Sequence, residues 1–225
     1  MFINEPANLC SCLDGFFKQW AMNRKAIEIK AKAMIEAEKL EKCGYFQSFP
    51  HQLTALATID AGKIRGEGQF PDSITNEMLV PHMTFLTPAV CLQVYSIYEG
   101  QKIDSEFITL CGSAYRYENG NFQDNSRTWE FSVREYVFIG KSEYILTMFD
   151  TTKNMINMLF AEMGIPFKYS HATDNFYPSK YNMLKARIQD SLRSKTEIVV
   201  KINKENLAVG SFNFHNKHFS QPFNF

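Results

Sequence analysis

The sequence lacks a long hydrophobic run and has no excess of charge of either sign. No stretch of about 18 apolar residues occurs in the 225-residue chain, so we expect no membrane-spanning helix. The 24 basic residues are balanced by 24 acidic residues. A protein that binds nucleic acid through many phosphate contacts normally carries a basic patch or tail, and none is evident here. The composition therefore disfavours tRNA as a partner.

The sequence also lacks the cysteine pattern of a disulfide-stabilised protein. Its five cysteines are odd in number and irregularly spaced, which is typical of reduced thiols in the cytoplasm. The N-terminus has no basic stretch followed by an apolar core, so we expect no signal peptide and a cytoplasmic location. The length predicts a single domain over residues 1–225, with an N-terminal helical segment at 1–44 and a sheet core at 45–225.

The order of the predicted elements indicates an α+β fold. Composition and apolar spacing predict three helices, at 20–43, 142–163 and 179–192. Extended patterns predict four strands, at 106–118, 128–139, 197–202 and 208–215. Asn23 is expected to cap the first helix, and Gly44 follows its end. Because helices and strands do not alternate regularly, we expect an antiparallel β-sheet flanked by helices.

The most informative feature is a pair of strands that share a charged face. Arg116 and Glu118 are two residues apart in the first strand, and Arg127, Phe131 and Glu135 are four apart in the second. Such a face is a poor core and a good ligand platform, because guanidinium groups bind phosphate and a phenyl ring stacks on a base. The alternative is a surface hairpin with ion pairs across it.

The sequence Arg116-Tyr-Glu118, a polar loop and Arg127-x-x-x-Phe131 resembles motif 2 of the class II aminoacyl-tRNA synthetases. In that motif the first Arg binds the α-phosphate of ATP, and the Glu lies near the adenine and the substrate amine. The loop Arg reaches the γ-phosphate, and the Phe stacks on the adenine. The resemblance implies these roles for Arg116, Glu118, Arg127 and Phe131, with ATP and Mg²⁺ as cofactors.

Further segments resemble the amino acid:carrier protein ligases, which are shortened relatives of the atypical seryl-tRNA synthetases. Five segments occur in the family's order, at 44–50, 88–91, 131–135, 173–177 and 211–219. The resemblance implies a homodimer that activates a small amino acid as an aminoacyl-adenylate. The aminoacyl group would then pass to the phosphopantetheine thiol of a carrier protein. Asn213 matches a position near the family's substrate pocket.

Cys91 and Glu135 resemble two of the family's three zinc ligands. In the family, the third ligand, a Cys, and motif 3 come after the point that corresponds to Phe225. We therefore expect a C-terminally incomplete class II catalytic domain in which a Zn²⁺ site lacks a ligand. His215 and His218 are candidate substitutes, although three-residue spacing in a strand or turn is a weak metal signal. For Cys91 the alternative is a small core residue.

Two other functions stay open at this stage. A homologue without motif 3 could be catalytically inactive, and could act as a binding or regulatory module or as one part of a split enzyme. The chain could also charge tRNA as a seryl-type synthetase, although no anticodon-binding or basic arm is visible in the sequence. An active chain without motif 3 is expected to be a weak ligase, because a preorganised phosphate contact would be missing.

Overall fold

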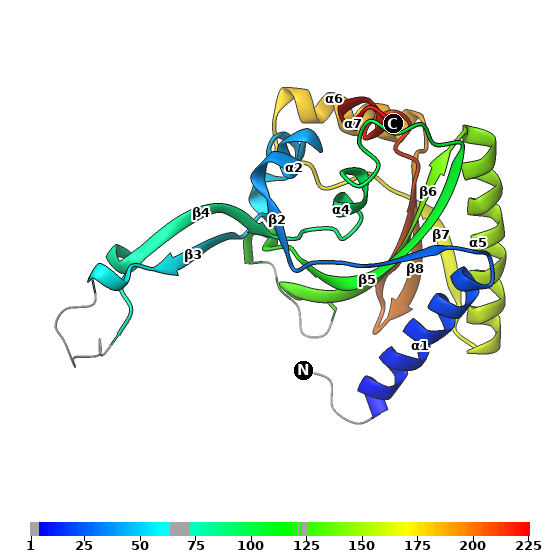
Figure 1. Ribbon diagram of the computed structural model, residues 1–225. Coiled ribbons are helices and arrows are strands. Elements are labelled where there is room, and N and C mark those ends of the chain that lie inside the picture. The colour runs from blue at the N-terminus through cyan, green and yellow to red at the C-terminus, as the bar shows by residue number, and fades with distance from the viewer. Residues whose placement is uncertain (1–4, 64–72, 121, 123–125) are drawn as a thin grey trace.

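The computed structural model describes residues 5–63, 73–120, 122 and 126–225 (Figure 1). In that part of the chain the strands form three sheets of three strands each. The first contains β1 (Ile27–Lys30), β5 (Ser105–Tyr115) and β6 (Glu130–Gly140). The second contains β2 (Met34–Glu36), β4 (Leu79–Leu86) and β3 (Ala55–Ile59). The third contains β7 (Phe167–His171), β8 (Lys195–Ile202) and β9 (Glu205–Asn213).

Seven α-helices occur in the described residues. They are α1 (Glu5–Met22), α2 (Ala37–Lys42), α3 (Tyr45–Ser48), α4 (Leu92–Tyr95), α5 (Ser142–Glu162), α6 (Lys180–Ser191) and α7 (Ser220–Phe223). Four 3-10 turns accompany them: η1 (Pro50–Gln52), η2 (Ala61–Lys63), η3 (Asn76–Met78) and η4 (Glu118–Gly120). None of the helices in the described ranges is both long and apolar enough to cross a bilayer.

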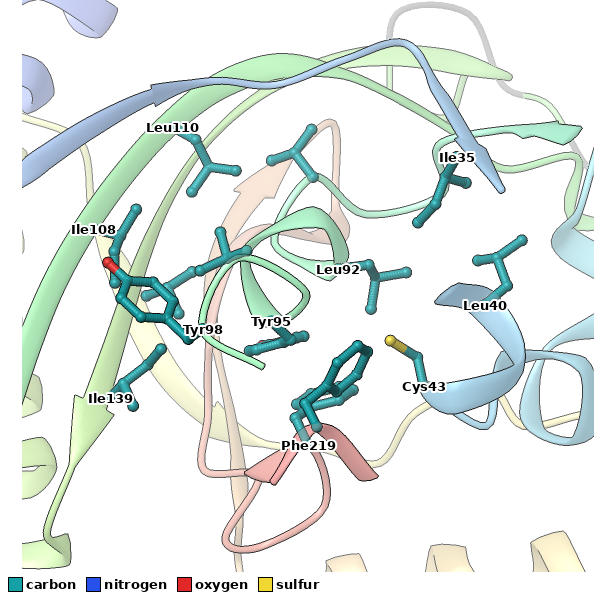
Figure 2. Close-up of a cluster of buried hydrophobic side chains, with 14 of the residues drawn as sticks. Ile35, Leu40, Cys43, Leu92, Tyr95, Tyr98, Ile108, Leu110, Ile139 and Phe219 are labelled. Carbon is teal, nitrogen blue, oxygen red and sulfur yellow. The ribbon is translucent and has the colours of Figure 1, made fainter. Parts of the chain in front are cut away.

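The long antiparallel ladder of β5 and β6 organises the fold. It pairs eleven residues of each strand, from Ser105 opposite Gly140 to Tyr115 opposite Glu130. One face, here called the inner face, packs its apolar side chains against α2, α4 and the C-terminal segment (Figure 2). The labelled side chains of this core are Ile35, Leu40, Cys43, Leu92, Tyr95, Tyr98, Ile108, Leu110, Ile139 and Phe219. Cys91, one of the predicted metal ligands, packs against this core.

The opposite, outer face of the ladder is covered by α1 and α5 (Figure 1). Trp20 of α1 stacks on Tyr136 of β6, with ring centroids 5.4 Å apart, and lies edge-on to Phe107 of β5. Met155 and other residues of α5 pack on the third sheet, where Phe212 is buried. Successive side chains of a strand point to opposite faces of the sheet. Alternate residues of β6 therefore belong to this aromatic layer, and the residues between them belong to the inner face.

The helix predicted over 20–43 is wrong. Helix α1 ends at Met22, and Lys25 has a left-handed backbone with φ 61°. The next residues form β1, which pairs in parallel with β5 through Ile27 opposite Ile108 and Ile29 opposite Leu110. Pairing with a strand some eighty residues away overrides the helix propensity of a region rich in Ala, Glu and Lys. The segment 1–44 is thus mixed, while the single-domain assignment stays a prediction.

The later elements agree better with the sequence. The helix predicted at 142–163 is α5, and the one at 179–192 is α6, whose N-cap Ser179 accepts a hydrogen bond from the Asn182 N–H. The antiparallel hairpin of β8 and β9 is also confirmed. The first predicted strand, at 106–118, ends early, because β5 stops at Tyr115. An α+β fold with mainly antiparallel pairing is therefore confirmed, with β1 and β5 as a parallel exception.

Candidate functional site

Arg116 lies directly after the end of β5 and is anchored to two neighbouring segments. Its backbone N–H donates to the Trp129 carbonyl at 2.9 Å, and its guanidinium Nε donates to the Pro88 carbonyl at 2.8 Å. The bond to Pro88 fixes the orientation of the planar group. The two terminal nitrogens of a guanidinium form a fork that matches two phosphate oxygens. Arg116 is thus held in a defined direction by these two hydrogen bonds.

Phe131 lies beside Arg116 on the inner face of β6. The guanidinium carbon of Arg116 is 5.3 Å from the centre of the Phe131 ring, which is within the range of a cation–π contact. The residue opposite Phe131 across the ladder is Ala114, whose side chain is short. The half-buried ring therefore sits next to a cation and faces a small residue, an arrangement that suits a flat aromatic ligand with attached phosphates.

Glu118 and Arg127 form an ion pair across the loop between β5 and β6. The Arg127 side chain is 51% exposed and that of Glu118 is 18% exposed. Glu118 lies in η4 with a left-handed φ of 48°, so Arg116 and Glu118 do not share a strand face as the sequence predicted. The alternative of an ion pair across the hairpin is confirmed for this pair. Arg127 precedes β6, which begins at Glu130.

The two predicted metal ligands lie together on the inner side. The Cys91 backbone N–H donates to the Glu135 carboxylate at 3.2 Å. Burial and then the negative charge of Glu135 raise the pKa of the Cys91 thiol well above its usual value. A cysteine binds zinc as the thiolate, and a zinc site normally has at least three protein ligands. Within the described ranges no group of three His, Cys, Asp or Glu side chains could hold a metal ion. The described residues therefore do not fit a complete zinc site.

The two histidines considered as substitute ligands contact an aromatic ring of the C-terminal segment. His215 and His218 pack edge-on against the Phe219 ring, with ring centroids 4.8 Å and 4.7 Å from it. His218 Nε2 lies 3.2 Å from the Cys43 carbonyl. In the part of the chain that is described, neither forms a metal-binding group with Cys91 and Glu135, so the suggestion that either replaces the third ligand is wrong for these residues.

Asn213 belongs to a second polar group at the end of the β8–β9 hairpin. It lies opposite Lys195 in the ladder, and its side-chain amide donates to Ser211 Oγ at 2.9 Å. Lys195 Nζ contacts Asp174 at 2.8 Å and Glu197 at 3.2 Å. Burial would raise the pKa of Asp174, but the charge and hydrogen bond of Lys195 hold this pKa below its usual value. Asp174 is therefore a negatively charged carboxylate that Lys195 holds in place.

Sequence reasoning missed Tyr45, a buried residue of α3. Burial raises the pKa of Tyr45, whereas the positive charge of Arg116 opposes the shift and Asp174 adds to it. The Tyr45 hydroxyl donates to Gln52 Oε1 at 2.9 Å. The sequence offered one signal, because Tyr45 lies in the 44–50 segment that resembles motif 1. Pro88, whose carbonyl orients Arg116, had the same kind of signal, because it begins the 88–91 segment that resembles the family.

Sequence comparisons place the chain near two kinds of amino acid ligase. It is 27% identical over 205 residues to the amino acid–[acyl-carrier-protein] ligase 1 of Bradyrhizobium diazoefficiens, covering 80% of this chain and 57% of the ligase. It is 27% identical over 147 residues to a type-2 serine–tRNA ligase of Methanococcus maripaludis, covering 61% of this chain and 29% of that protein. No protein-family model matches the chain.

Structural comparisons identify the fold. A crystal structure of M. kandleri SerRS with A. aeolicus tRNASec has a TM-score of 0.71 and 18% identity, over 92% of this chain and 45% of the other. Cytoplasmic serine-tRNA ligase from Naegleria fowleri, in complex with AMP, has a TM-score of 0.70 and 12% identity, over 100% of this chain and 48% of the other. The chain therefore has the fold of a class II synthetase catalytic core. It spans about half the length of the structures it matches.

Proposed function

We propose that the chain binds ATP and activates the carboxylate of a small amino acid. The observation that carries the proposal is the pairing of Arg116 and Phe131 at the end of the ladder, with the guanidinium held on Pro88 and lying 5.3 Å from the ring. A phosphate-binding fork beside an aromatic ring suits a nucleotide. The relatives that the chain resembles are amino acid ligases, which supports this choice.

The proposed reaction needs positioning and charge neutralisation rather than a covalent step on the protein. A carboxylate oxygen of the amino acid attacks the α-phosphorus of ATP, and the bond from that phosphorus to the bridging oxygen of the β-phosphate breaks. The products are an aminoacyl-adenylate and pyrophosphate. Arg116 would neutralise charge on the α-phosphate, Arg127 would contact the γ-phosphate, and Mg²⁺ would enter with ATP. Phe131 would hold the adenine.

Arg127 must exchange partners when ATP binds. Its side chain, which is half exposed, pairs with the less exposed carboxylate of Glu118. The contact with Glu118 is itself a charged hydrogen bond, so its strength lies between about 0–1 kcal/mol for an exposed ion pair and about 1.5–3 kcal/mol for a shielded one. A triphosphate carries more negative charge than one carboxylate, so it can compete with Glu118 for Arg127. The released Glu118 carboxylate would then be available near the adenine and the substrate amine, as the resemblance implies.

Asn213 and the neighbouring charged residues Asp174 and Lys195 are proposed to face the amino acid substrate. Phe212 points into the layer beneath α5, so its neighbour Asn213 lies on the other face of the third sheet. We keep Cys91 and Glu135 as proposed metal-site residues, and assign no reaction step to a metal because the described residues supply only two ligands. A homodimer also remains a proposal, which sedimentation of the purified chain would test.

We propose a carrier protein as the acceptor, docking on α6. This helix exposes an apolar stripe of residues spaced by three and four positions, Tyr181, Leu184, Ile188 and Leu192. Exposed basic residues flank it, among them Lys180, Arg187 and Arg193. An apolar stripe with a basic border suits an acidic protein surface better than bare phosphates. The Leu184→Glu variant should keep adenylate formation and lose transfer to a phosphopantetheinylated carrier protein.

The decisive experiment combines an ATP titration with amino-acid-dependent ATP–pyrophosphate exchange. The Arg116→Ala variant should weaken ATP binding by about tenfold or more, because a charged hydrogen bond to phosphate contributes about 1.5–3 kcal/mol. Arg24→Ala is the matched control, since it removes the same charge from an exposed residue stacked on Trp20 at the outer face. Equal ATP binding by the Arg116→Ala variant and the wild type would refute the proposed site.

The same experiment separates the alternatives. Binding of ATP without pyrophosphate exchange would favour a binding or regulatory module, or one part of a split enzyme. Exchange followed by transfer to tRNA rather than to a carrier protein would favour a seryl-type synthetase. The likeness to the type-2 serine–tRNA ligases makes that control necessary.

A further inference from the structure

We propose that Tyr45 is a positioning residue for nucleotide binding, and that it acts through Gln52 on the turn that carries Arg116 and Glu118. The proposal rests on the proposed function and adds a residue to it. Tyr45 lies in α3 and Gln52 lies at the end of η1, so both belong to a segment far from the turn in sequence. Neither would contact the phosphates through its side chain.

A chain of two hydrogen bonds links Tyr45 to the turn. The Tyr45 hydroxyl lies 2.9 Å from Gln52 Oε1 and donates to it, and the two residues are only 7% and 6% exposed. The backbone carbonyl of Gln52 accepts a hydrogen bond from the Tyr117 N–H at 3.1 Å. Tyr117 stands between Arg116 and Glu118, so the position of Gln52 sets the path of the backbone that carries both side chains.

The turn lies beyond the regular ladder, where the Arg116 N–H still donates to the Trp129 carbonyl and the Tyr117 N–H donates to Gln52 instead. The β5–β6 ladder ends at Tyr115, opposite Glu130. Beyond it the chain enters η4, where Glu118 has a left-handed φ of 48° that residues other than glycine rarely adopt. Such a conformation persists only where the surrounding structure holds it. The bond from Tyr117 to Gln52 ties this strained turn to the buried segment α3–η1.

The hydroxyl group, rather than the ring, carries the proposed role. The Tyr45 ring packs on the Phe49 ring, with centroids 5.1 Å apart, and phenylalanine would keep that packing. Burial raises the pKa of Tyr45, so the hydroxyl stays protonated and remains a hydrogen-bond donor at neutral pH. Removing it leaves a buried amide oxygen of Gln52 without this donor. Gln52 would then shift toward another partner and carry its backbone carbonyl with it.

The test uses Tyr45→Phe with Tyr136→Phe as the matched control. Tyr136 also has a half-buried hydroxyl, which donates to the Phe17 carbonyl at 2.6 Å, but it lies on the outer face. Each variant loses one hydroxyl and one hydrogen bond, so a general loss of stability should affect both. Two readouts are measured on the full chain: hydrogen exchange of a peptide spanning 115–118, and the dissociation constant for ATP.

We expect Tyr45→Phe to accelerate exchange at 115–118 and to weaken ATP binding about three- to tenfold, the range of one hydrogen bond. Tyr136→Phe should leave both readouts at wild-type values. Unchanged exchange and affinity in Tyr45→Phe, or equal losses in the two variants, would overturn the proposal. If the wild type does not bind ATP, the proposed function fails and the nucleotide role of Tyr45 fails with it. The exchange readout then still decides whether Tyr45 holds the turn.

Discussion

Removal of Asp14 tests how α1 is held on the outer face of the ladder. The Asp14 carboxylate accepts hydrogen bonds from Arg134 Nε at 2.5 Å and from Arg134 Nη2 at 3.0 Å. Arg134 also donates to Thr109 Oγ1 at 3.0 Å, and Glu28 lies 3.7 Å from Nη2. The Asp14→Ala change would leave the guanidinium with Thr109 and the more distant Glu28. We expect this change to destabilise the fold.

The expected loss is about 2 kcal/mol of unfolding free energy. Breaking a fully buried ion pair costs about 3–5 kcal/mol, whereas an exposed pair contributes about 0–1 kcal/mol. The Arg134 side chain is 7% exposed and that of Asp14 is 38% exposed, so the pair lies between these limits. For a chain of this size, about 2 kcal/mol lowers the melting temperature by about 4–8 °C.

The effect should also depend on pH. The hydrogen bond from Arg134 is the main reason that the pKa of Asp14 lies below its ordinary value in the folded chain. A lowered native pKa means that the stabilisation is complete above the unfolded pKa, near 3.9, and is lost as pH falls through the native value. The difference in stability between wild type and Asp14→Ala should therefore be constant from about pH 5 to 7 and shrink below about pH 4.

Urea unfolding followed by circular dichroism measures this difference. The matched control is Glu99→Ala, which removes a carboxylate from an exposed pair with Lys42 and should leave the unfolding midpoint unchanged. The double variant Asp14→Leu/Arg134→Met should recover part of the loss, because no unpaired guanidinium remains. A loss below about 0.5 kcal/mol in Asp14→Ala at pH 7 would refute the reasoning, since that is the range of ordinary surface substitutions.

Four further predictions concern buried side chains and the predicted ligand residues. Phe223→Ala should cost about 3–5 kcal/mol in urea unfolding, because this ring is fully buried near the C-terminus; a cost below about 1 kcal/mol would contradict its place in the core. Phe131→Ala should weaken ATP binding about tenfold at unchanged stability, and equal affinity would exclude a stacking role. Iodoacetamide should label exposed Cys10 before Cys91, as peptide mass spectrometry would reveal. Elemental analysis should find well below one zinc per chain, and a full equivalent of zinc that is lost in Cys91→Ala would reveal a ligand beyond Glu135.

The sequence determined the elements whose signal is local. The apolar spacing of 142–163 and the turn residues after it predicted α5, because a helix buries one face every three to four residues. The helix predicted at 179–192 and the strands predicted at 197–202 and 208–215 had the same local character. The motif resemblance also predicted the class II core and named Arg116 and Phe131, which the structure brings side by side. Their roles in binding remain predictions.

Only the tertiary structure decided the parts that depend on distant partners. Residues 27–30 have helix-forming neighbours and become strand because β5 offers an edge to pair with. Glu118 leaves the strand because the ladder ends at Tyr115, which no local pattern marks. Arg134 is buried because Asp14, 120 residues earlier, neutralises it. Burial and charge pairing are properties of groups that meet in space, whereas spacing along one segment reports only that segment's own periodicity.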